Sequence, residues 1–250
     1  MRLLWIKFKK SDTKKPSHGI IMIMRTKIIL ETADILVCEK PAGLAVQSMS
    51  GYQADLVSEL KNYLSEKCGR KNPYLGLIHR LDQPVEGLLA VARTKAAAAD
   101  LSRRLADGTL KKKYLAILDG IPGQKEDTLI HYLKKDARTN RACICDGPQD
   151  GAKRAQLSYR ILEEKDGHAL AEIEIATGRF HQIRAQMAQA GYPLAGDARY
   201  GKTSGSGGLA LCAYFLEFYD LFAKTPRKFV MRPGNERFAE MTVLWQEDFF

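Results

Sequence analysis

The sequence predicts an α+β protein in which mostly antiparallel strands dominate and helices lie on the outside. Between residues 127 and 177, apolar and polar side chains alternate in four runs that Gly and Asp turns separate. This is the pattern of half-buried antiparallel strands. Apolar residues also recur at helical spacing ahead of glycines that can end a helix. Hydrophobic residues make up 45% of the 250-residue chain, which is enough for a packed core.

The folded part is expected to open with two short strands. Residues 27–31 and 34–39 are apolar runs of strand length, and Lys40-Pro41-Ala42-Gly43 supplies a turn after them. A compact domain therefore begins near residue 28.

Two helices are expected in the first half of the chain. Apolar residues recur at helical spacing over 53–68, and Gly69 follows as a stop. The alanine-rich segment 95–107 predicts a second helix, with Gly108 where a left-handed cap is expected. Their apolar stripes are most simply explained by packing on the core.

Two buried strands are expected around these helices. Residues 87–93 follow a loop that carries Asp82 just before Gln83-Pro84, which places Asp82 at a strand edge. A further strand is predicted over 113–118. Alternation puts three of its side chains on one face: Tyr114, Ala116 and Leu118.

The second half is predicted to form an antiparallel meander over 127–177, followed by a helix over 181–190. Strand-like runs occur again at 209–216 and near Phe229 and Met241. The glycine-rich stretch 201–208 is typical of a surface loop.

The net charge of +10 is unevenly distributed. Residues 1–27 hold eight basic residues and one acidic residue, which is +7, so the other 223 residues carry only +3. We expect 1–27 to form a basic, disordered extension and 28–250 to form one domain. Because the excess lies in the extension, net charge alone does not locate a nucleic-acid surface.

Cysteine usage and hydropathy indicate the compartment. The five cysteines are an odd number without a CxxC pair, which is typical of reduced thiols. Cys143 and Cys145 are close in sequence, but no histidine and cysteine set completes four ligands, so no metal or other cofactor is expected. No apolar run approaches the roughly 20 residues that span a bilayer. These features predict a cytoplasmic protein without membrane attachment.

One polar constellation lies at residues 79–87, where a cation, a carboxylate and a turn occur together. It contains His79, Arg80 and Asp82. Taken alone, an aspartate before a proline turn is usually a turn residue, and a His-Arg pair at a strand end is often solvated.

Two further polar segments follow. Thr177-Gly178-Arg179 leads into a helix start at His181-Gln182-Ile183-Arg184, with more polar side chains than capping requires. His181 and Arg184 are three residues apart and share a helix face. Lys113-Tyr114 lies in a strand, where tyrosine is most often packing and lysine is most often a solvated edge or a phosphate contact.

In their joint order these segments resemble the RluA-type family of RNA pseudouridine synthases, nearly end to end from residue 28. The matching blocks are Lys40-Pro41-Ala42-Gly43-Leu44, His79-Arg80-Leu81-Asp82 with Gly87, Lys113-Tyr114, residues 177–184, Gly196-Asp197 and Tyr200-Gly201. The chain departs from the family at Val85, Glu86 and Phe180, which puts the fine shape of the substrate loop in doubt. The small RNA-binding S4 domain of many relatives is not expected, because 27 residues are too few for a domain with its own core.

The resemblance implies the pseudouridine synthase fold, in which two halves of a sheet flank a catalytic cleft that receives a flipped uridine. Asp82 is implied as the catalytic carboxylate, acting as a nucleophile at C1′ or as a base at C2′. Because burial disfavours an anion, we expect a salt bridge from Arg184 to Asp82. Tyr114 and Arg184 are the other expected catalytic residues, and Tyr114 is expected to stack on the uracil with its hydroxyl near the C5 proton that must leave. The remaining expected substrate-binding residues are His79, Arg80, Lys113, Thr177, Gly178, Arg179, His181, Gln182 and Ile183.

The expected activity is therefore isomerisation of uridine in structured RNA, ribosomal RNA before transfer RNA, by a monomer. One alternative is an RNA-binding or RNA-folding protein with secondary or lost catalysis. Another is a carboxylate-dependent hydrolase, with Glu86 as the second acid, which would release free uracil.

Overall fold

The computed structural model describes residues 24–48, 53–69, 71–201, 207–246 and 248–249. Residues 1–23 of the predicted basic extension and residues 202–206 of the predicted loop lie outside the described residues. Among the residues described, no helix is both long and apolar enough to cross a membrane.

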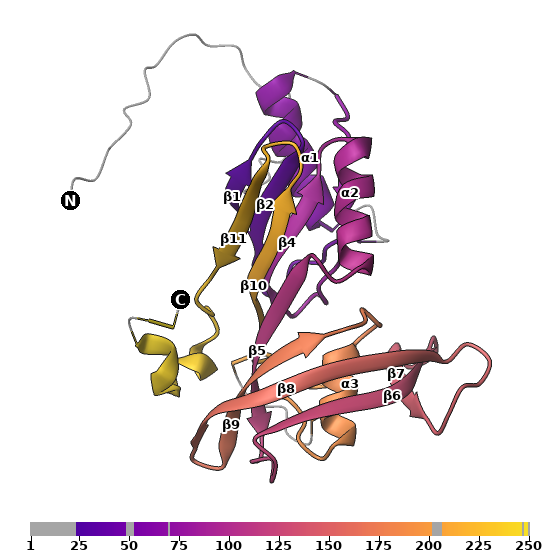
Figure 1. Cartoon of the computed structure of the whole chain (residues 1–250), viewed down its shortest axis with the longest axis vertical. Coiled ribbons are helices and arrows are strands. Elements are labelled where there is room, and N and C mark those ends of the chain that lie inside the picture. Colours follow the sequence, from indigo (N-terminus) through magenta and orange to yellow (C-terminus); the bar gives the residue numbers. More distant parts are fainter. Residues whose placement is uncertain (1–23, 49–52, 70, 202–206, 247, 250) are drawn as a thin grey trace.

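The described strands form one sheet with the order β1-β2-β4-β10-β5-β9-β8-β6-β7, in which β11 pairs with β10 and β3 with β4 (Figure 1). All pairs are antiparallel except β4 with β10. The strands are β1 (Lys27–Glu31), β2 (Ile35–Lys40), β3 (Gly76–Leu77), β4 (Glu86–Ala92), β5 (Lys111–Asp119), β6 (Glu126–Asp136), β7 (Arg141–Cys145), β8 (Lys153–Lys165), β9 (His168–Ile175), β10 (Leu211–Asp220) and β11 (Thr225–Val230). The helices are α1 (Leu56–Cys68), α2 (Lys95–Ala106), α3 (Gln182–Gln189) and the short 3-10 helices η1 (Glu236–Glu240) and η2 (Thr242–Trp245).

The ends of α1 and α2 follow from their flanking residues, and the glycines after both helices are those that the sequence predicted. The side chain of Asp55 accepts a hydrogen bond from the first turn of α1, and Gly69 ends that helix at φ 69°. Thr94 caps α2 in the same way. Gly108 follows α2 at φ 76°, a backbone angle that a residue with a Cβ rarely adopts.

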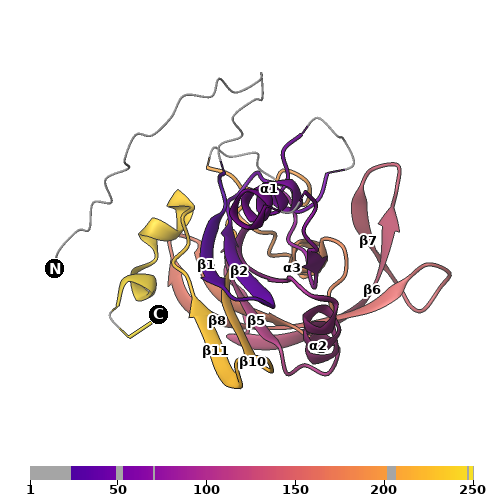
Figure 2. The same cartoon turned by 90° about the horizontal axis from the view of Figure 1, so that it is seen from above.

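The two faces of the sheet carry different covers. On one face, α1 and α3 pack on a core that includes Tyr114, Ala116 and Leu118 of β5, which confirms the predicted alternation. On the other face, α2 packs on residues such as Val37 and Leu88, and the two 3-10 helices pack on Leu115 and Ile117. Figure 2 shows α1 and α3 together inside the curve of the sheet.

The order of the strands over 127–177 differs from the predicted meander. The pairs are antiparallel, but β7 and β8 lie on opposite edges of β6, and Leu133 of β6 pairs with both. Alternation along a chain predicts which side chains share a face, whereas strand order depends on contacts between distant segments.

The strand predicted near Met241 is wrong. The segment forms η1 and η2 instead. Phe238, Met241 and Leu244 recur every third residue, which is the repeat of a 3-10 helix, and all three are buried against the sheet.

The fold also includes residues before the expected boundary at residue 28. The backbone N–H and the hydroxyl of Thr26 donate to Glu59 Oε2 at 3.1 and 2.6 Å, and the N–H of Arg25 donates to the same oxygen at 3.2 Å. Because Glu59 is buried on α1, these bonds anchor the segment that precedes β1.

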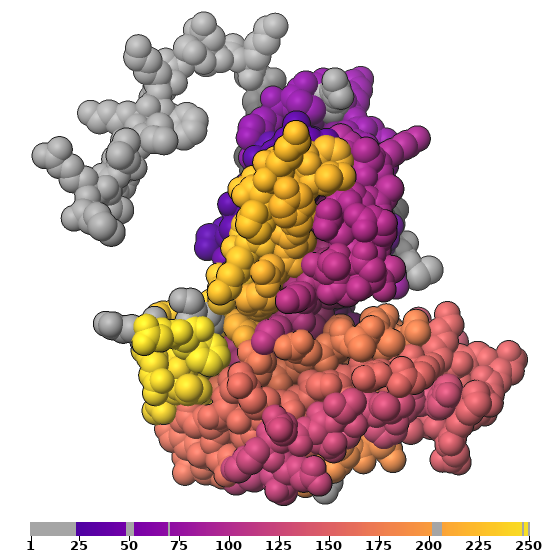
Figure 3. Space-filling model, in the orientation of Figure 1, coloured from indigo at the N-terminus to yellow at the C-terminus, as the bar shows by residue number. Residues whose placement is uncertain are grey.

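The sheet has two halves that share β5. One half holds β1, β2 and β4 with α1 and α2, the other holds β6 to β9 with α3, and β5 runs from one to the other (Figure 1). A narrower waist joins the halves in the space-filling view (Figure 3). The loop before β4 and the start of α3 meet between these halves, and they carry the candidate site.

Candidate active site

Asp82 is held in a loop that is fastened from both sides. Leu81 and Val85 bury their side chains in the core that faces α1 and α3, which leaves the Asp82 side chain 26% exposed between them. The buried Lys40 ammonium donates to the backbone carbonyl of Gln83 at 3.1 Å. It also donates to two carbonyls of its own turn, at 2.9 and 2.7 Å. The loop is thereby tied to the end of β2.

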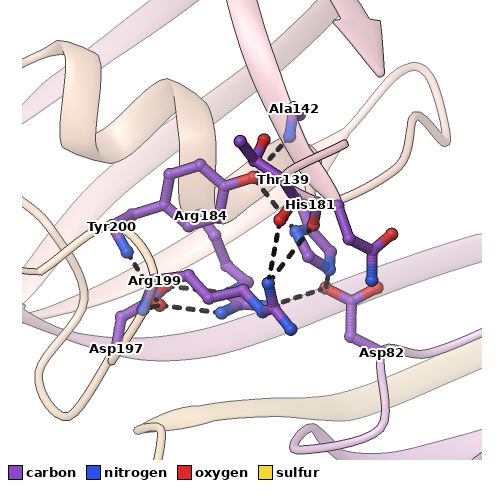
Figure 4. A network of polar contacts seen from close by, with 9 residues as sticks. Asp82, Thr139, Ala142, His181, Arg184, Asp197, Arg199 and Tyr200 are labelled. Atoms are coloured by element: carbon purple, nitrogen blue, oxygen red, sulfur yellow. Dashed lines mark hydrogen bonds and ion pairs between the residues drawn. The ribbon is translucent and has the colours of Figure 1, made fainter. Parts of the chain in front are cut away.

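Arg184 reaches Asp82 from the other half of the sheet, and the predicted salt bridge is confirmed (Figure 4). Its Nη1 lies 3.5 Å from Asp82 Oδ2. Its Nε and Nη2 donate to the two carboxylate oxygens of Asp197 at 2.8 and 2.7 Å. Asp197 is fully buried and also accepts from the backbone N–H groups of Arg199 and Tyr200. The hydrogen bonds with Asp197 therefore fix the position of the guanidinium independently of its contact with Asp82.

His181 is a second neighbour of Asp82. Its Nε2 lies 3.7 Å from Asp82 Oδ2, and its Nδ1 lies 3.0 Å from the hydroxyl of Tyr200. That hydroxyl accepts a hydrogen bond from the backbone N–H of Ala142 on β7. Phe180 stacks on the imidazole with ring centroids 3.8 Å apart, which fixes the plane of the ring.

The charges of the site have opposite consequences for its two carboxyl groups. Burial raises the pKa of Asp82, and the charge and hydrogen bond of Arg184 oppose that rise. Burial also acts to raise the pKa of Asp197, but there the hydrogen bonds and charge of Arg184 prevail and lower it. Burial, together with Arg184 and Arg199, lowers the pKa of His181 to about 4, so its contact with Asp82 at neutral pH involves a neutral ring.

Tyr114 and Ile183 line the same interior. Both are nearly fully buried and belong to the core that faces α1 and α3. Burial raises the pKa of the Tyr114 hydroxyl, and the charge of nearby Asp82 adds to the rise. The structure thus brings Asp82, Arg184 and His181 together in one contact network. Tyr114 lies near enough for the charge of Asp82 to affect the pKa of its hydroxyl.

The other polar residues before α3 bind one another. The Gln182 side-chain oxygen accepts from the Thr177 hydroxyl at 2.7 Å and from the backbone N–H of Arg179 at 3.0 Å. Arg179 donates through Nε to the carbonyl of Arg154. Thr177, Arg179 and Gln182 thus shape the turn into α3, and Gly178 is exposed within it.

Three predicted substrate-binding residues are not brought to Asp82. Lys113 lies on the opposite face of β5 from Tyr114, where its ammonium contacts Glu172 and Glu174 at 3.2 and 2.9 Å. His79 is buried, and its Nε2 accepts from the backbone N–H of Ala90 at 3.4 Å. Arg80 is exposed at the surface of the loop.

Three residues of the network had no role in the sequence prediction: Lys40, Asp197 and Tyr200. Each lies in a sequence block that carried the family resemblance, but nothing in the sequence indicated which residue it would contact. Their contacts with Gln83, Ala142 and Arg184 join residues between 13 and 58 positions apart, which local spacing does not reveal.

Glu86 does not act as a second acid toward Asp82. Its carboxylate accepts from the backbone N–H groups of Gly234 and Asn235 at 3.0 and 3.1 Å, beside β10. This departure from the family holds the segment after β11. In the part of the chain that the structure describes, no group of three His, Cys, Asp or Glu side chains is placed to hold a metal ion.

The comparisons with known proteins agree with this architecture. The family described as RNA pseudouridylate synthase matches residues 34–189, a range that contains Asp82, Tyr114 and Arg184. Human RNA pseudouridylate synthase domain containing 4 superimposes with a TM-score of 0.69 at 21% identity, over 83% of this chain and 89% of that one, and so shares the fold.

Curated relatives extend the comparison. Ribosomal large subunit pseudouridine synthase D of Nitrosomonas europaea is 36% identical over 71% of this chain and 50% of its own length. An uncharacterised RNA pseudouridine synthase of Zymomonas mobilis is 32% identical over 72% of this chain and 80% of its own length. The chain thus spans about half the length of the first of these relatives. From the family match and these identities, the chain belongs to the RNA pseudouridylate synthase family, as its sequence motifs predicted.

Proposed function

We propose that this protein isomerises uridine to pseudouridine in RNA, with Asp82 as the catalytic carboxylate. The observation that carries the proposal is the half-buried Asp82, held by an arginine that a buried second aspartate locks in place. In this arrangement the carboxylate has a fixed position, is partly shielded from water and lies beside a positive charge. That charge favours the ionised form, which is the form that must react.

The reaction moves the uracil on its ribose without net change in composition. The bond from C1′ to N1 breaks, a bond from C1′ to C5 forms, C5 loses a proton and N1 gains one. The Asp82 carboxylate assists at the sugar, as a nucleophile at C1′ or as a base at C2′. Arg184 keeps the carboxylate ionised and in place, and therefore acts in both routes.

Tyr114 and Ile183 supply the apolar surroundings of the flipped base in this proposal. A ring face for the uracil is worth about 1 to 3 kcal/mol per stacked base. Because burial raises the pKa of the Tyr114 hydroxyl, it remains protonated at neutral pH and can donate to a base oxygen.

The surface around α3 supports RNA as the partner. Seven exposed basic residues lie on β6, β7, β8 and the turns beside them, and none has a carboxylate within ion-pair distance among the described residues. They are Lys134, Lys135, Arg138, Arg141, Lys153, Arg154 and Arg199. The hairpin of β6 and β7 contacts the site directly, because Arg141 lies over the ring of Tyr200 and Lys135 over that of Phe180. A cluster of unpaired cations beside the reacting carboxylate suits phosphate groups.

Ribosomal RNA is the substrate class that we propose, in the cytoplasm and with one chain forming the whole site. The support is that the Nitrosomonas relative is named for the large ribosomal subunit. Asp82, Arg184, Asp197, His181 and Tyr200 also come from a single chain.

The test is release of tritium from C5-labelled uridine in ribosomal and in transfer RNA that lack pseudouridine. We expect release from ribosomal RNA, and none with Asp82→Asn. Asp107→Asn is the matched control, because Asp107 is exposed at the end of α2. Release from transfer RNA alone would change the substrate class. Binding without release from either RNA would instead support an RNA-binding protein.

A further inference from the structure

The hydroxyl of Tyr200 lies between a backbone N–H and the ring of His181, and two guanidinium groups lie near the tyrosine ring. The backbone N–H of Ala142 donates to the hydroxyl at 2.6 Å, and the guanidinium groups of Arg141 and Arg184 lie 4.9 and 5.3 Å from the ring centroid. Among the described residues, the acceptor within hydrogen-bond distance of this hydroxyl is His181 Nδ1, at 3.0 Å.

These contacts decide where His181 carries its proton. A tyrosine hydroxyl has one proton to donate, and a neutral imidazole has one N–H and one acceptor nitrogen. If Nδ1 carried the proton, the hydroxyl would accept from both sides and its own proton would have no acceptor in the described part of the chain. With Nδ1 as the acceptor, the hydroxyl accepts from Ala142 and donates its proton to His181, so each donor has an acceptor. The proton of the ring then lies on Nε2, which faces Asp82.

We propose that Tyr200 and His181 are positioning residues for Asp82: Tyr200 donates to Nδ1, which holds His181 as the tautomer that points its Nε2–H at Asp82 Oδ2. This inference rests on the proposed function only for its catalytic consequence. At 3.7 Å the N–H acts on the carboxylate as a dipole rather than as a short hydrogen bond.

The arrangement distinguishes the two oxygens of Asp82. Both Arg184 Nη1 and His181 Nε2 approach Oδ2. In the described part of the chain, no donor lies within hydrogen-bond distance of Oδ1. Oδ2 is therefore the oxygen that the protein holds, and Oδ1 is the oxygen presented to the sugar.

The neighbours of His181 favour a neutral ring rather than a cation. Arg184, Arg199 and Lys135 lie near it and oppose a further positive charge, against the attraction of Asp197 and Asp82. Phe180 on one side keeps the ring in plane. In a neutral ring, a hydroxyl that donates to one nitrogen determines that the proton lies on the other nitrogen.

The direct test is nitrogen NMR of the whole chain labelled with ¹⁵N-histidine. His181→Asn assigns the signal by its loss, and asparagine suits the left-handed backbone at this position, where φ is 50°. We expect protonated Nε2 and bare Nδ1 from pH 6 to 8, and a mixture of tautomers in Tyr200→Phe. A protonated Nδ1 or an imidazolium in the unaltered chain would overturn the arrangement.

The kinetic consequence is tested with the same variants. Tyr200→Phe removes the hydroxyl and keeps the ring, so kcat for tritium release is expected to fall about three- to tenfold, the size of one neutral hydrogen bond. KM should change less than twofold. The acidic limb of the pH profile of kcat should move to higher pH, because in some of the molecules Nε2 no longer carries the proton whose N–H dipole stabilises the ionised carboxylate of Asp82. A purely structural role would leave that limb in place.

Tyr132→Phe is the matched control, since Tyr132 is a tyrosine of β6 that makes no hydrogen bond or ring contact with His181 among the described residues. An unchanged kcat and pH profile in Tyr200→Phe would overturn the positioning role. If the unaltered protein released no tritium, the proposed function would fail instead, and the NMR spectrum would still decide the tautomer.

Discussion

Arg184 binds Asp197 through two hydrogen bonds of 2.8 and 2.7 Å and turns its remaining nitrogen, Nη1, toward Asp82 at 3.5 Å. Asp197 is therefore the stronger partner, and it sets where the guanidinium meets the candidate catalytic carboxylate. The side chain of Asp197 is fully buried and that of Arg184 is 5% exposed, so neither charge is screened by water.

Asp197→Asn is expected to cost both stability and turnover. Loss of one partner leaves the Arg184 charge buried and poorly compensated, which typically costs about 3 to 5 kcal/mol. Because the pKa of Asp197 is lowered in the folded protein, this stabilisation is present above the ordinary value of 3.8 and is lost as the pH falls below it. Urea unfolding at pH 7 and at pH 3.5 measures the difference, which should shrink at the lower pH.

Asp220→Asn is the matched control for that experiment. Asp220 is also buried and bonded to an arginine and to backbone N–H groups, but it lies at the end of β10, in contact with Arg227. It should lose stability and keep the kcat of the folded protein. Equal losses of kcat in both variants would contradict a specific role for Asp197.

Asp82→Asn is expected to change stability in the opposite direction. Burial raises the pKa of Asp82 in the folded protein, so its ionisation costs folding free energy as the pH rises above 3.8. The neutral amide avoids that cost, and the free energy of unfolding at pH 7 should rise. Thermal unfolding of the two proteins at pH 7 and pH 4 tests this, and a clear destabilisation at pH 7 would refute it.

Lys40→Met is expected to loosen the Asp82 loop. The substitution keeps an apolar stem but removes three hydrogen bonds to backbone carbonyls, one of them on Gln83. Unsatisfied buried carbonyls cost about 1 to 3 kcal/mol, and kcat should fall more than KM rises. Lys27→Met serves for comparison, because Lys27 is 69% exposed in an ion pair with Glu39 and should change stability by less than about 1 kcal/mol. Equal effects would argue against a special role for Lys40.

The local features of the fold were predictable from the sequence. Gly69 and Gly108 mark the ends of two helices, because their backbone angles exclude most other residues. The face shared by Tyr114 and Leu118 follows from alternation. Strand order was not predictable, because the pairing of β6 with β8 depends on segments that local patterns do not connect.

Of the site, only the pairing of the buried carboxylate with a cation was predictable from the sequence. A buried carboxylate needs a cation, so Asp82 implied a partner, and Arg184 was named correctly. The need of Arg184 for Asp197 was not foreseen, although a buried guanidinium needs a partner of its own. Alternation along β5 puts Lys113 on the opposite face from Tyr114, so the prediction of Lys113 as a substrate-binding residue came from its place in the motif and not from local spacing.

The cations of the hairpin are expected to set the salt dependence of RNA binding. Replacing Lys134 and Arg138 by glutamine should weaken binding and lower the slope of log K against log salt. The slope falls by about 0.7 to 0.9 for each phosphate contact that is lost. Lys95→Gln with Lys224→Gln removes the same charge from exposed positions elsewhere and should leave the slope nearly unchanged. Affinity titrations at several salt concentrations measure both, and equal slopes would exclude the hairpin as a phosphate contact.

The most direct measurement is nucleoside analysis of ribosomal RNA after incubation with the protein and with Asp82→Asn. We expect the unaltered protein to form a nucleoside of unchanged mass in which uracil is linked through carbon, and Asp82→Asn to form none. Free uracil would identify a hydrolase. Equal product from Asp82→Asn would show that this carboxylate is not the catalytic group.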